Sequence, residues 1–258
     1  MIDLHIHLLP GVDDGPGTLD EAVTMCRRAA EDGCSALVTT PHQRHEAWWN
    51  GDLQRLEARR TRLQDELGGT PRIYLGGEVR ANEGLLEDLD RGPAGGVASL
   101  AGGSYLLVEF SRFIPDPDPT GLIHELAVAG WRPVLAHVEE IRWLAEDPEL
   151  IGRLVGLGAM LQVTGQNVLG RNGRTVERSA LDLLDAGLVH FLASDAHNLE
   201  TRPPGLSEAR ALVARHWGDA VGKLLTEINP GAVVEDRPLP APDEVLTAAA
   251  GEGEPARP

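Results

Sequence analysis

Short apolar segments that alternate with longer amphipathic ones constrain the fold of this chain most strongly. The apolar segments are rich in Val, Ile and Leu without polar alternation, which is typical of strands buried on both faces of a parallel sheet. They lie at residues 2–5, 36–40, 72–76, 105–110, 133–137, 160–164 and 190–193. Because helical stretches lie between them, the β–α unit repeats about seven times, which predicts an α/β fold, either a barrel or a doubly wound sheet.

The helical stretches between these segments carry recognisable end signals. Thr18 and Glu21 form a capping-box pattern at the start of one helix. Asp147 is an N-cap residue followed by Pro148 at the first helical position of another. Helices are predicted over residues 18–32, 44–67, 147–156, 176–186 and 206–217.

The length of 258 residues fits one large α/β domain or two small ones. No internal repeat or linker divides the chain, so residues 1–235 are predicted to form a single domain. Residues 236–258 are rich in Pro, Ala and Glu and are predicted to be a flexible C-terminal tail.

Charge and composition exclude several classes of protein. A net charge of −17 argues against a broad nucleic-acid interface, because such interfaces draw their affinity from basic surface. The N-terminus lacks a signal-peptide pattern, and no apolar run approaches the roughly 18 residues that span a bilayer. Cys26 and Cys34 give no disulfide framework and fit a reducing compartment. We therefore expect a cytoplasmic protein without membrane insertion.

Side chains that bind metals follow the ends of the predicted strands. Any one of them alone is more often a hydrogen-bonded structural residue. In a βα barrel, however, these strand ends converge on one face, and carboxylates gathered there repel one another unless cations lie between them. The residues in question are His5, His7, Asp13, Asp14, His42, Glu78, Glu109, His137, Asp195 and His197.

The types of side chain indicate which metals bind and how many. His5 and His7 point to the same side of an extended strand, which suits a chelate. Imidazole and carboxylate ligands without thiolates favour zinc, manganese or iron. About eight ligands exceed what one tetrahedral ion uses, so two or three divalent ions are expected.

Clustered divalent ions favour hydrolysis of phosphate esters. They polarise a phosphoryl oxygen and lower the pKa of a bound water, so that no cysteine or serine nucleophile is needed. A cysteine-dependent phosphatase requires a Cys-x5-Arg loop, and neither Cys26 nor Cys34 has that context.

Six motifs, in family-like order and spacing from Met1 to about Pro204, resemble the polymerase and histidinol phosphatase (PHP) superfamily. They are MIDLHIHLLPGVDDGP, TTPH, GGEVR, LLVEF, VLAHVE and FLASDAHNLETRPP. They look like one branch in particular, the bacterial tyrosine phosphatases of capsule and exopolysaccharide systems. The resemblance implies a distorted (β/α)7 TIM-like barrel. It also implies phosphotyrosine on a bacterial tyrosine autokinase of polysaccharide assembly as the substrate class.

The resemblance also implies a ligand set, with Glu78 shared between two ions. It implies one ion held by His5, His7, Glu78 and Asp195, a second by Glu78, Glu109 and His137, and a third by Asp14, His42 and His197. Asp14 is preferred over Asp13 because it occupies the Asp-Gly position of the family pattern. The metal in this family is often manganese.

The family pattern also includes arginines that contact phosphate. Relatives follow the histidine at position 137 with Pro-Glu-Arg, whereas this chain has Glu140 in place of that arginine. Arg142 is a candidate to compensate, at a different spacing. Arg202 matches the second phosphate-contacting arginine, in the Asn-x-x-x-Arg-Pro-Pro segment.

Other residues near the expected site have competing interpretations. Arg44 is a candidate phosphate contact and His45 a candidate proton donor to the leaving oxygen; equally, both fit a solvated helix start. Trp48 and Trp49 are candidates for an aromatic wall, although adjacent tryptophans on a helix point apart. The remaining residues considered are predicted to be structural: His124, His190, His216, Cys26 and Cys34.

The leading hypothesis is a metal-dependent phosphatase of tyrosine-phosphorylated protein, with His42 and Arg202 in its site. A second hypothesis is a small-molecule phosphatase of the same superfamily, acting on histidinol phosphate or a nucleotide. A third is a metal-bearing barrel without catalysis, kept as a regulatory or assembly module.

Overall fold

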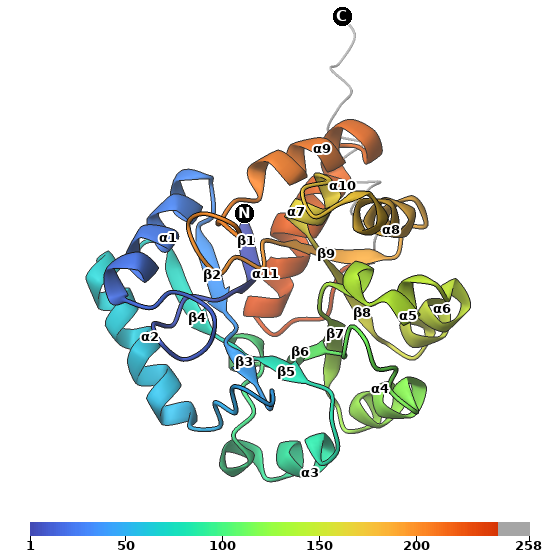
Figure 1. Cartoon of the computed structure of the whole chain (residues 1–258), viewed down its shortest axis with the longest axis horizontal. Coiled ribbons are helices and arrows are strands. Elements are labelled where there is room, and N and C mark those ends of the chain that lie inside the picture. The colour runs from blue at the N-terminus through green and yellow to red at the C-terminus, as the bar shows by residue number, and fades with distance from the viewer. Residues whose placement is uncertain (242–258) are drawn as a thin grey trace, which may run out of the picture.

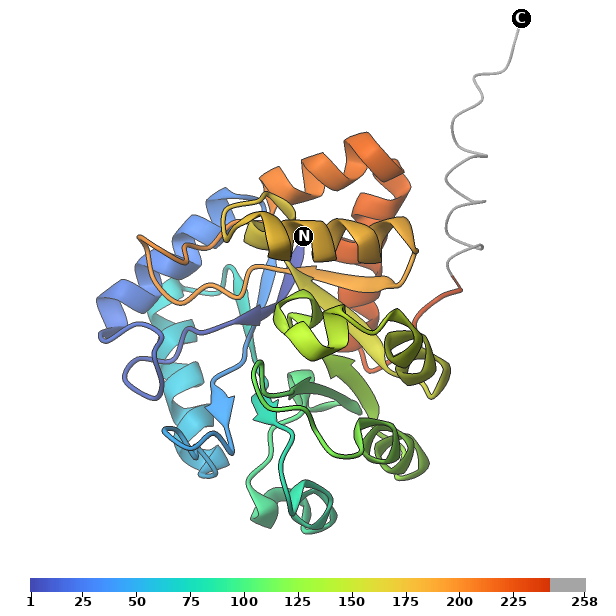
Figure 2. The same ribbon diagram turned by 45° about the vertical axis from the view of Figure 1, so that its right-hand side comes forward.

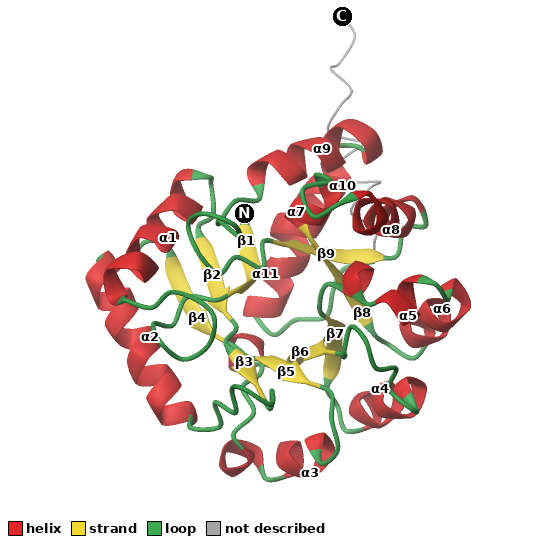
Figure 3. Cartoon of the chain, in the orientation of Figure 1, coloured by secondary structure: helices red, strands yellow, loops and turns green. Residues whose placement is uncertain are grey.

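The computed structural model describes residues 1–241 and shows an α/β fold with two parallel sheets. One sheet has the strand order β1-β2-β4 and the other β3-β5-β6-β7-β8-β9. Figures 1 and 2 show helices around the outside of the strands, and Figure 3 separates the two kinds of element by colour. The α/β prediction and the parallel pairing are therefore confirmed.

The described elements have the following bounds. The strands are β1 Ile2–Ile6, β2 Ala36–Thr39, β3 His42–Gln43, β4 Arg72–Leu75, β5 Glu78–Arg80, β6 Tyr105–Glu109, β7 Arg132–Leu135, β8 Met160–Thr164 and β9 Val189–Ala193. The helices are α1 Leu19–Glu31, α2 Leu53–Leu67, α3 Leu85–Asp90, α4 Pro119–Val128, α5 Arg142–Ala145, α6 Pro148–Gly156, α7 Gly165–Val168, α8 Arg174–Asp185, α9 Ser207–Trp217, α10 Asp219–Lys223 and α11 Asn229–Val234.

Every predicted strand is present, but sequence reasoning missed the short strands β3 and β5. Each follows a longer strand after a brief interruption: β3 follows β2, and β5 follows β4. In the second sheet, β3 pairs with β5, with His42 opposite Glu78. Two candidate metal ligands therefore lie on paired strands rather than on free loops.

The helix predicted over residues 44–67 is wrong in its first part, because α2 begins only at Leu53. Arg44 and Asn50 both have positive φ, at 56° and 44°, which an α-helix does not accommodate. The Asn50 side chain donates to the backbone oxygens of Val12 and His42 and holds the segment as a loop. Asp52 is the N-cap residue of α2, and its carboxylate accepts a hydrogen bond from the backbone N–H of Arg55.

The ends of β1 and β9 lie side by side. Ile6 and Ala196 form an isolated parallel bridge, and the backbone N–H of Asp195 donates to the carbonyl of His5 (2.8 Å). The buried carboxylate of Asp3 accepts from the backbone N–H groups of Ser194 (3.0 Å) and His5 (3.3 Å). These bonds hold the chain after β9 against β1.

Both faces of the strands are buried, as the lack of polar alternation predicted. Leu106 and Val108 of β6 belong to the large apolar cluster that includes the helices. Tyr105 and Leu107 of the same strand belong to a smaller cluster, which Val233 of α11 also joins. Apolar side chains thus fill the space along the first residues of the strands, and the polar side chains described below follow at the strand ends.

The first residues of the predicted tail contact the domain. The Asp236 carboxylate accepts from the backbone N–H (2.8 Å) and hydroxyl (2.6 Å) of Ser104, and the Tyr105 hydroxyl donates to the Arg237 carbonyl (2.6 Å). Residues 242–258, the rest of that predicted tail, lie outside the described residues. Within residues 1–241, no helix has the length and apolar character needed to cross a membrane.

Glycine is required at the interruption between β4 and β5. A Cβ at Gly77 would overlap the Gln43 amide, with Cδ at 2.7 Å. That amide is buried and fixed, since it donates to the carbonyls of Asn50 and Gly96 and accepts from Ala98 N–H. The close approach at Gly77 places the next residue, Glu78, beside β3.

Replacing Gly77 with Ala is expected to destabilise the fold by about 1–3 kcal/mol, because Gln43 must give up fixed hydrogen bonds. For a domain of this size the melting temperature should fall by roughly 2–12 °C. The matched control is Gly152→Ala in α6, where a Cβ meets nothing within 4 Å and helix propensity improves. Equal melting temperatures for the two variants in thermal denaturation would contradict this account.

Candidate metal centre

The predicted ligands converge at the ends of the parallel strands. Their donor atoms form three groups, and within each group the atoms lie within 4.8 Å of one another. The groups are His7, Asp14, His42 and His197; His5, His7 and Asp195; and His42, Glu78 and Glu109. His137, which is in none of the groups, lies 2.7 Å from Glu78. The structure therefore brings together every residue that the sequence proposed as a ligand.

Glu78 is the centre of this arrangement. Its Oε1 lies 2.7 Å from His137 Nε2 and 3.6 Å from His5 Nε2. Its Oε2 lies 2.7 Å from His42 Nδ1 and 3.5 Å from His7 Nε2. A single buried carboxylate thus faces four imidazoles from three segments of the chain, a geometry in which Glu78 can contact two ions.

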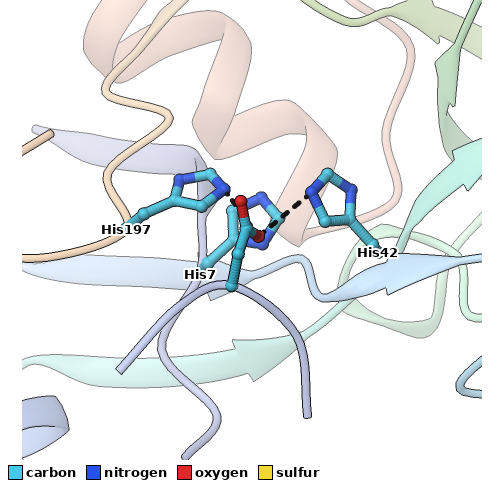
Figure 4. Close-up of side chains that lie close together, drawn as sticks. His7, His42 and His197 are labelled. Carbon is cyan, nitrogen blue, oxygen red and sulfur yellow. Dashed lines mark ion pairs between the residues drawn. The ribbon is translucent and has the colours of Figure 1, made fainter. Parts of the chain in front are cut away.

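Asp14 lies between the imidazoles of His42 and His197. Its Oδ1 lies 3.3 Å from Nε2 of both His42 and His197. Figure 4 shows His7, His42 and His197 gathered around these ion pairs, and the His7 and His197 rings stack with centroids 3.8 Å apart. This grouping matches the predicted third ion site, with His7 added.

Charge complementarity shifts the pKa values in the cluster. Burial alone would raise the pKa of Glu78, but His42 and His5 hold it well below its usual range. Burial alone would lower the pKa of His5, but Asp195 and Glu78 raise it to about 9. Glu109 has a raised pKa because it is buried and close to the negative charge of Glu78. The carboxylates of this cluster therefore depend on positive charge beside them.

Two candidate ligands sit on strained backbone. His137 has φ 31° and Asp195 has φ 51°, in the left-handed region that non-glycine residues rarely occupy. Both are held by their backbone N–H groups: His137 donates to Gln162 Oε1 (2.9 Å) and Asp195 to the His5 carbonyl (2.8 Å). Strain held in this way is common at functional sites, where it aims a side chain.

The donor set fits divalent metal ions. Within residues 1–241, twelve buried side-chain polar atoms have no hydrogen-bond partner, and half of them belong to this cluster. Those in the cluster are His42 Nδ1, Glu78 Oε2, Glu109 Oε2, His137 Nδ1, Asp195 Oδ1 and His197 Nε2. A buried polar atom without a partner lowers the stability of the fold. Carboxylate oxygens and imidazole nitrogens that face one another without well-aligned hydrogen bonds can instead all coordinate one cation.

Asp13 and Asp14 have different positions, and the one that faces the cluster is Asp14, which the family pattern favoured as the ligand. Asp13 Oδ2 lies 2.7 Å from His7 Nδ1 and accepts from the His42 backbone N–H (3.1 Å). Asp13 therefore orients His7 from outside the cluster, whereas Asp14 faces into it. A carboxylate on the far nitrogen of an imidazole is the usual support of a metal-binding histidine.

Gln162 supports His5 in the same way and was missed by sequence reasoning. Its Oε1 lies 3.1 Å from His5 Nδ1 and also accepts from the His137 backbone. Because the oxygen accepts, His5 donates from Nδ1 and presents Nε2 to the cluster. The signal was available, since Gln162 is the polar residue within the apolar strand β8 (MLQVT).

Arg202 lies at the mouth of the cluster. Its Nη2 lies 2.7 Å from Asp195 Oδ2 and its Nη1 lies 3.7 Å from Asp14 Oδ2, while 35% of the side chain stays exposed. His45 is also at the mouth, with its Nδ1 accepting from the Ala47 backbone. Burial, followed by the charge of Arg80, lowers the pKa of His45.

The structure does not place Arg44 at the site. The side chain is buried, and its guanidinium donates to Asn82 Oδ1 (2.9 Å) and the Glu83 carbonyl (2.7 Å) and pairs with Asp88. Both interpretations of Arg44 were therefore wrong: it neither faces phosphate nor starts a solvated helix. These contacts pin the loop between β3 and α2 instead.

Arg142 does not reach the cluster either. It is 83% exposed and pairs with Glu146 (2.8 Å). Glu140 pairs instead with Arg112 (2.9 Å), a residue that sequence reasoning missed together with Arg80. Arg80 and Arg112, but not Arg142, line a cavity of about 250 Å³ over the cluster. The residues that line it are Asp14, His42, His45, Trp48, Glu78, Arg80, Glu109, Ser111, Arg112, Phe113, His137 and Arg202.

The remaining predictions have mixed outcomes. Trp48 lies over His42, with ring centroids 5.2 Å apart, whereas Trp49 is largely exposed beneath the Arg44 guanidinium. His190 accepts from the Leu161 backbone, as expected of a structural histidine. His124 and His216 are exposed on helices away from the cluster, and Cys26 and Cys34 are buried as predicted.

Comparison with known proteins places this geometry in context. A family model described as capsular polysaccharide synthesis, CpsB/CapC, matches residues 1–235. CapC of Staphylococcus aureus is 32% identical over 209 residues, which cover 79% of each chain. The tyrosine-protein phosphatase YwqE of Bacillus subtilis is 31% identical over 231 residues, covering 88% of this chain and 89% of that protein.

Solved structures extend the comparison. The fold matches a structure described as YwqE from Bacillus subtilis and CpsB from Streptococcus pneumoniae, unique metal-dependent tyrosine phosphatases, with a TM-score of 0.84 at 30% identity. The match covers 93% of this chain and 96% of that one. A phosphotriesterase from Mycobacterium tuberculosis, at 12% identity and a TM-score of 0.55 over 92% of this chain and 93% of that one, shares the fold alone.

Removing the Asp13 carboxylate is expected to weaken metal binding by about 10- to 100-fold, because His7 loses the group that orients its ring. Binding of Mn²⁺ or Zn²⁺ by Asp13→Ala should be measured by calorimetry. The matched control is Asp65→Ala, on the exposed surface of α2. If both variants bind metal as the wild type does, Asp13 has no supporting role.

Metal affinity is expected to rise with pH, because metal binds imidazole only after the proton leaves. The pKa of His5 is raised to about 9 and that of His42 to about 11, where Glu78 and Asp14 overcome the lowering by burial. Both rings are therefore protonated at neutral pH in the metal-free protein, and protons compete with the metal. Calorimetry between about pH 6 and about pH 8, in buffers of different ionisation enthalpy, should show tighter binding as pH rises and proton release at every pH, because both pKa values lie above this range. An affinity independent of pH would contradict this.

Proposed function

Because the chain belongs to the CpsB/CapC family of capsular polysaccharide synthesis, we propose that it is a metal-dependent protein-tyrosine phosphatase that acts in the regulation of capsular or extracellular polysaccharide synthesis. The observation that carries this function is the buried cluster around Glu78, with Arg202 at its open side. A cytoplasmic location, expected from the sequence, belongs to the same proposal.

The proposed cofactors are two or three divalent ions, with manganese preferred and zinc or iron as alternatives. The three groups of facing donors support this number, and the absence of thiolates among them supports the choice of metals. We assign His5, His7, Glu78 and Asp195 to one ion, Glu78, Glu109 and His137 to a second, and Asp14, His42 and His197 to a third. His7 and His42 each fall in two of the groups, so they are candidates to serve a neighbouring ion as well.

The side chains around the cluster have distinct roles in this proposal. When bound, the ions supply an acidified water and a polarised phosphoryl oxygen. Arg202 orients the phosphoryl group, since its fork presents further N–H donors while it pairs with Asp195. Trp48, whose ring is parallel to His42 within 13°, gives the tyrosine ring an aromatic surface.

His45 is the proposed proton donor to the leaving phenolate oxygen. It lies beside His42 and Trp48, with ring centroids 5.4 and 5.0 Å away. The Ala47 backbone N–H occupies its Nδ1, so the transferable proton is on Nε2. A lowered pKa makes His45 a weak base but a readier acid once protonated.

We also propose that the two sheets form one distorted (β/α)7 barrel within a single domain of residues 1–235. The short strands β3 and β5 carry the second sheet on from β2 and β4, and the bridge between Ile6 and Ala196 supports contact at the other edge. The substrate proposed for this domain is a phosphotyrosine protein, a bacterial tyrosine autokinase of polysaccharide assembly.

Hydrolysis of a phosphotyrosine peptide by the Mn²⁺-loaded protein tests the function. We expect kcat/KM for the peptide to exceed the values for histidinol phosphate and a nucleoside monophosphate, and a chelator to abolish activity. His42→Ala should remove activity, because His42 contacts both Glu78 and Asp14. His124→Ala, on the exposed face of α4, is the control and should retain it.

The alternatives have their own outcomes in this experiment. Preference for the small phosphomonoesters by a large factor would replace the tyrosine phosphatase by a small-molecule phosphatase. Lack of any hydrolysis while metal is bound would favour the non-catalytic regulatory module.

A further inference from the structure

Arg112 lies where two cavities meet. It follows β6 by three residues and lines the 250 Å³ cavity over the metal cluster. It also lines an adjoining cavity of about 700 Å³, and Phe113 and Arg202 are shared between the two in the same way. A phosphate ester in the inner cavity that extends into the larger one therefore passes these side chains.

The guanidinium of Arg112 has a carboxylate partner outside the metal cluster. Arg80 and Arg202 pair with Glu109 and Asp195, which are candidate metal ligands. Arg112 pairs with Glu140 through Nη2 (2.9 Å), and this is its one ion pair within residues 1–241. Because an arginine carries five N–H donors, most donors of Arg112 remain open to the cavity.

The surroundings hold Arg112 in place. Asn167 donates to Glu140 Oε1 (2.7 Å) and to the buried Glu139 (2.6 Å), which fixes the carboxylate that the guanidinium contacts. The indole of Trp143 donates to the carbonyl of Ser111 (2.9 Å) and fixes the backbone just before Arg112. The arginine is still 39% exposed, so a ligand can reach it.

We propose that Arg112 is a substrate-binding residue that donates hydrogen bonds to the phosphoryl oxygens of the ester, with Glu140 and Asn167 holding its guanidinium in position. The proposal rests on the phosphatase function above. It makes Glu140 a tether for the arginine rather than a phosphate contact, since its own charge repels phosphate.

Binding of inorganic phosphate to the Mn²⁺-loaded protein tests this by calorimetry, beside steady-state kinetics with a phosphotyrosine peptide. Arg112→Ala should weaken phosphate binding and raise KM by about 10- to 100-fold, the range expected for charge-assisted hydrogen bonds, with a smaller change in kcat. Arg112→Lys should fall between the wild type and Arg112→Ala, because it keeps the charge without the fork.

Glu140→Gln distinguishes an Arg112 that binds the substrate from an Arg112 that only anchors its loop. Like Arg112→Ala, it removes the ion pair between Arg112 and Glu140, but it keeps the arginine and removes a negative charge near the phosphate. We expect phosphate binding as tight as in the wild type or tighter. If Arg112 only anchors its loop, Glu140→Gln and Arg112→Ala should weaken binding equally, and that result would overturn the proposal. Arg178→Ala, an exposed arginine of α8 paired with Asp182 (2.8 Å) and outside both cavities, is the matched control and should not change phosphate binding.

These measurements also keep the inference separate from the proposed function. A wild-type protein that binds phosphate but hydrolyses no ester overturns the phosphatase assignment, while the comparison of Arg112→Ala with Glu140→Gln still decides the role of Arg112. Equal phosphate affinity in the wild type and Arg112→Ala overturns the inference alone, whatever the rate of hydrolysis.

Discussion

Burying a carboxylate costs several kcal/mol unless positive charge surrounds it, and Glu78 is buried among four imidazoles. Much of the fold serves this one group. Its position on β5 follows from the interruption at Gly77, and its neighbours arrive from β1, β3 and the turn after β7. Segments far apart in the chain therefore form a cluster that none of them could form alone.

The supporting contacts have the same purpose. Asp13 and Gln162 set the orientation of His7 and His5, and backbone hydrogen bonds hold His137 and Asp195 in left-handed conformations. Fixed donors in a dry site bind a cation without reorganising when it arrives, which favours both affinity and electrostatic catalysis. Tyr105, Leu107 and Phe191 belong to a buried apolar cluster between the strands, which leaves no room for water on that side of the metal cluster.

The sequence predicted the strands and the candidate ligands because those signals are local. Apolar runs mark buried strands, and a polar residue directly after such a run lies at the strand end, as for Glu109 after the residues of β6. The prediction failed where a local pattern had several outcomes. Residues 44–52 were predicted to be the first part of a helix. They form a loop instead, because the side chains of Asn50 and the buried Arg44 donate hydrogen bonds to segments far away in the sequence. Arg112 lies outside every motif, and Arg80, although it ends the GGEVR motif, was given no role.

The sequence by itself determined the α/β class, the family motifs and the types of ligand, because periodicity and residue chemistry are properties of short segments. The family pattern favoured Asp14 over Asp13 as the ligand, but only the tertiary structure showed that Asp13 supports His7 instead, and which arginines line the mouth of the cluster. The physical reason is that these choices depend on where side chains point relative to strands far away in the chain. The direction of a side chain cannot be read from its residue type: Asp14 meets His197 because β1 and the chain after β9 lie side by side.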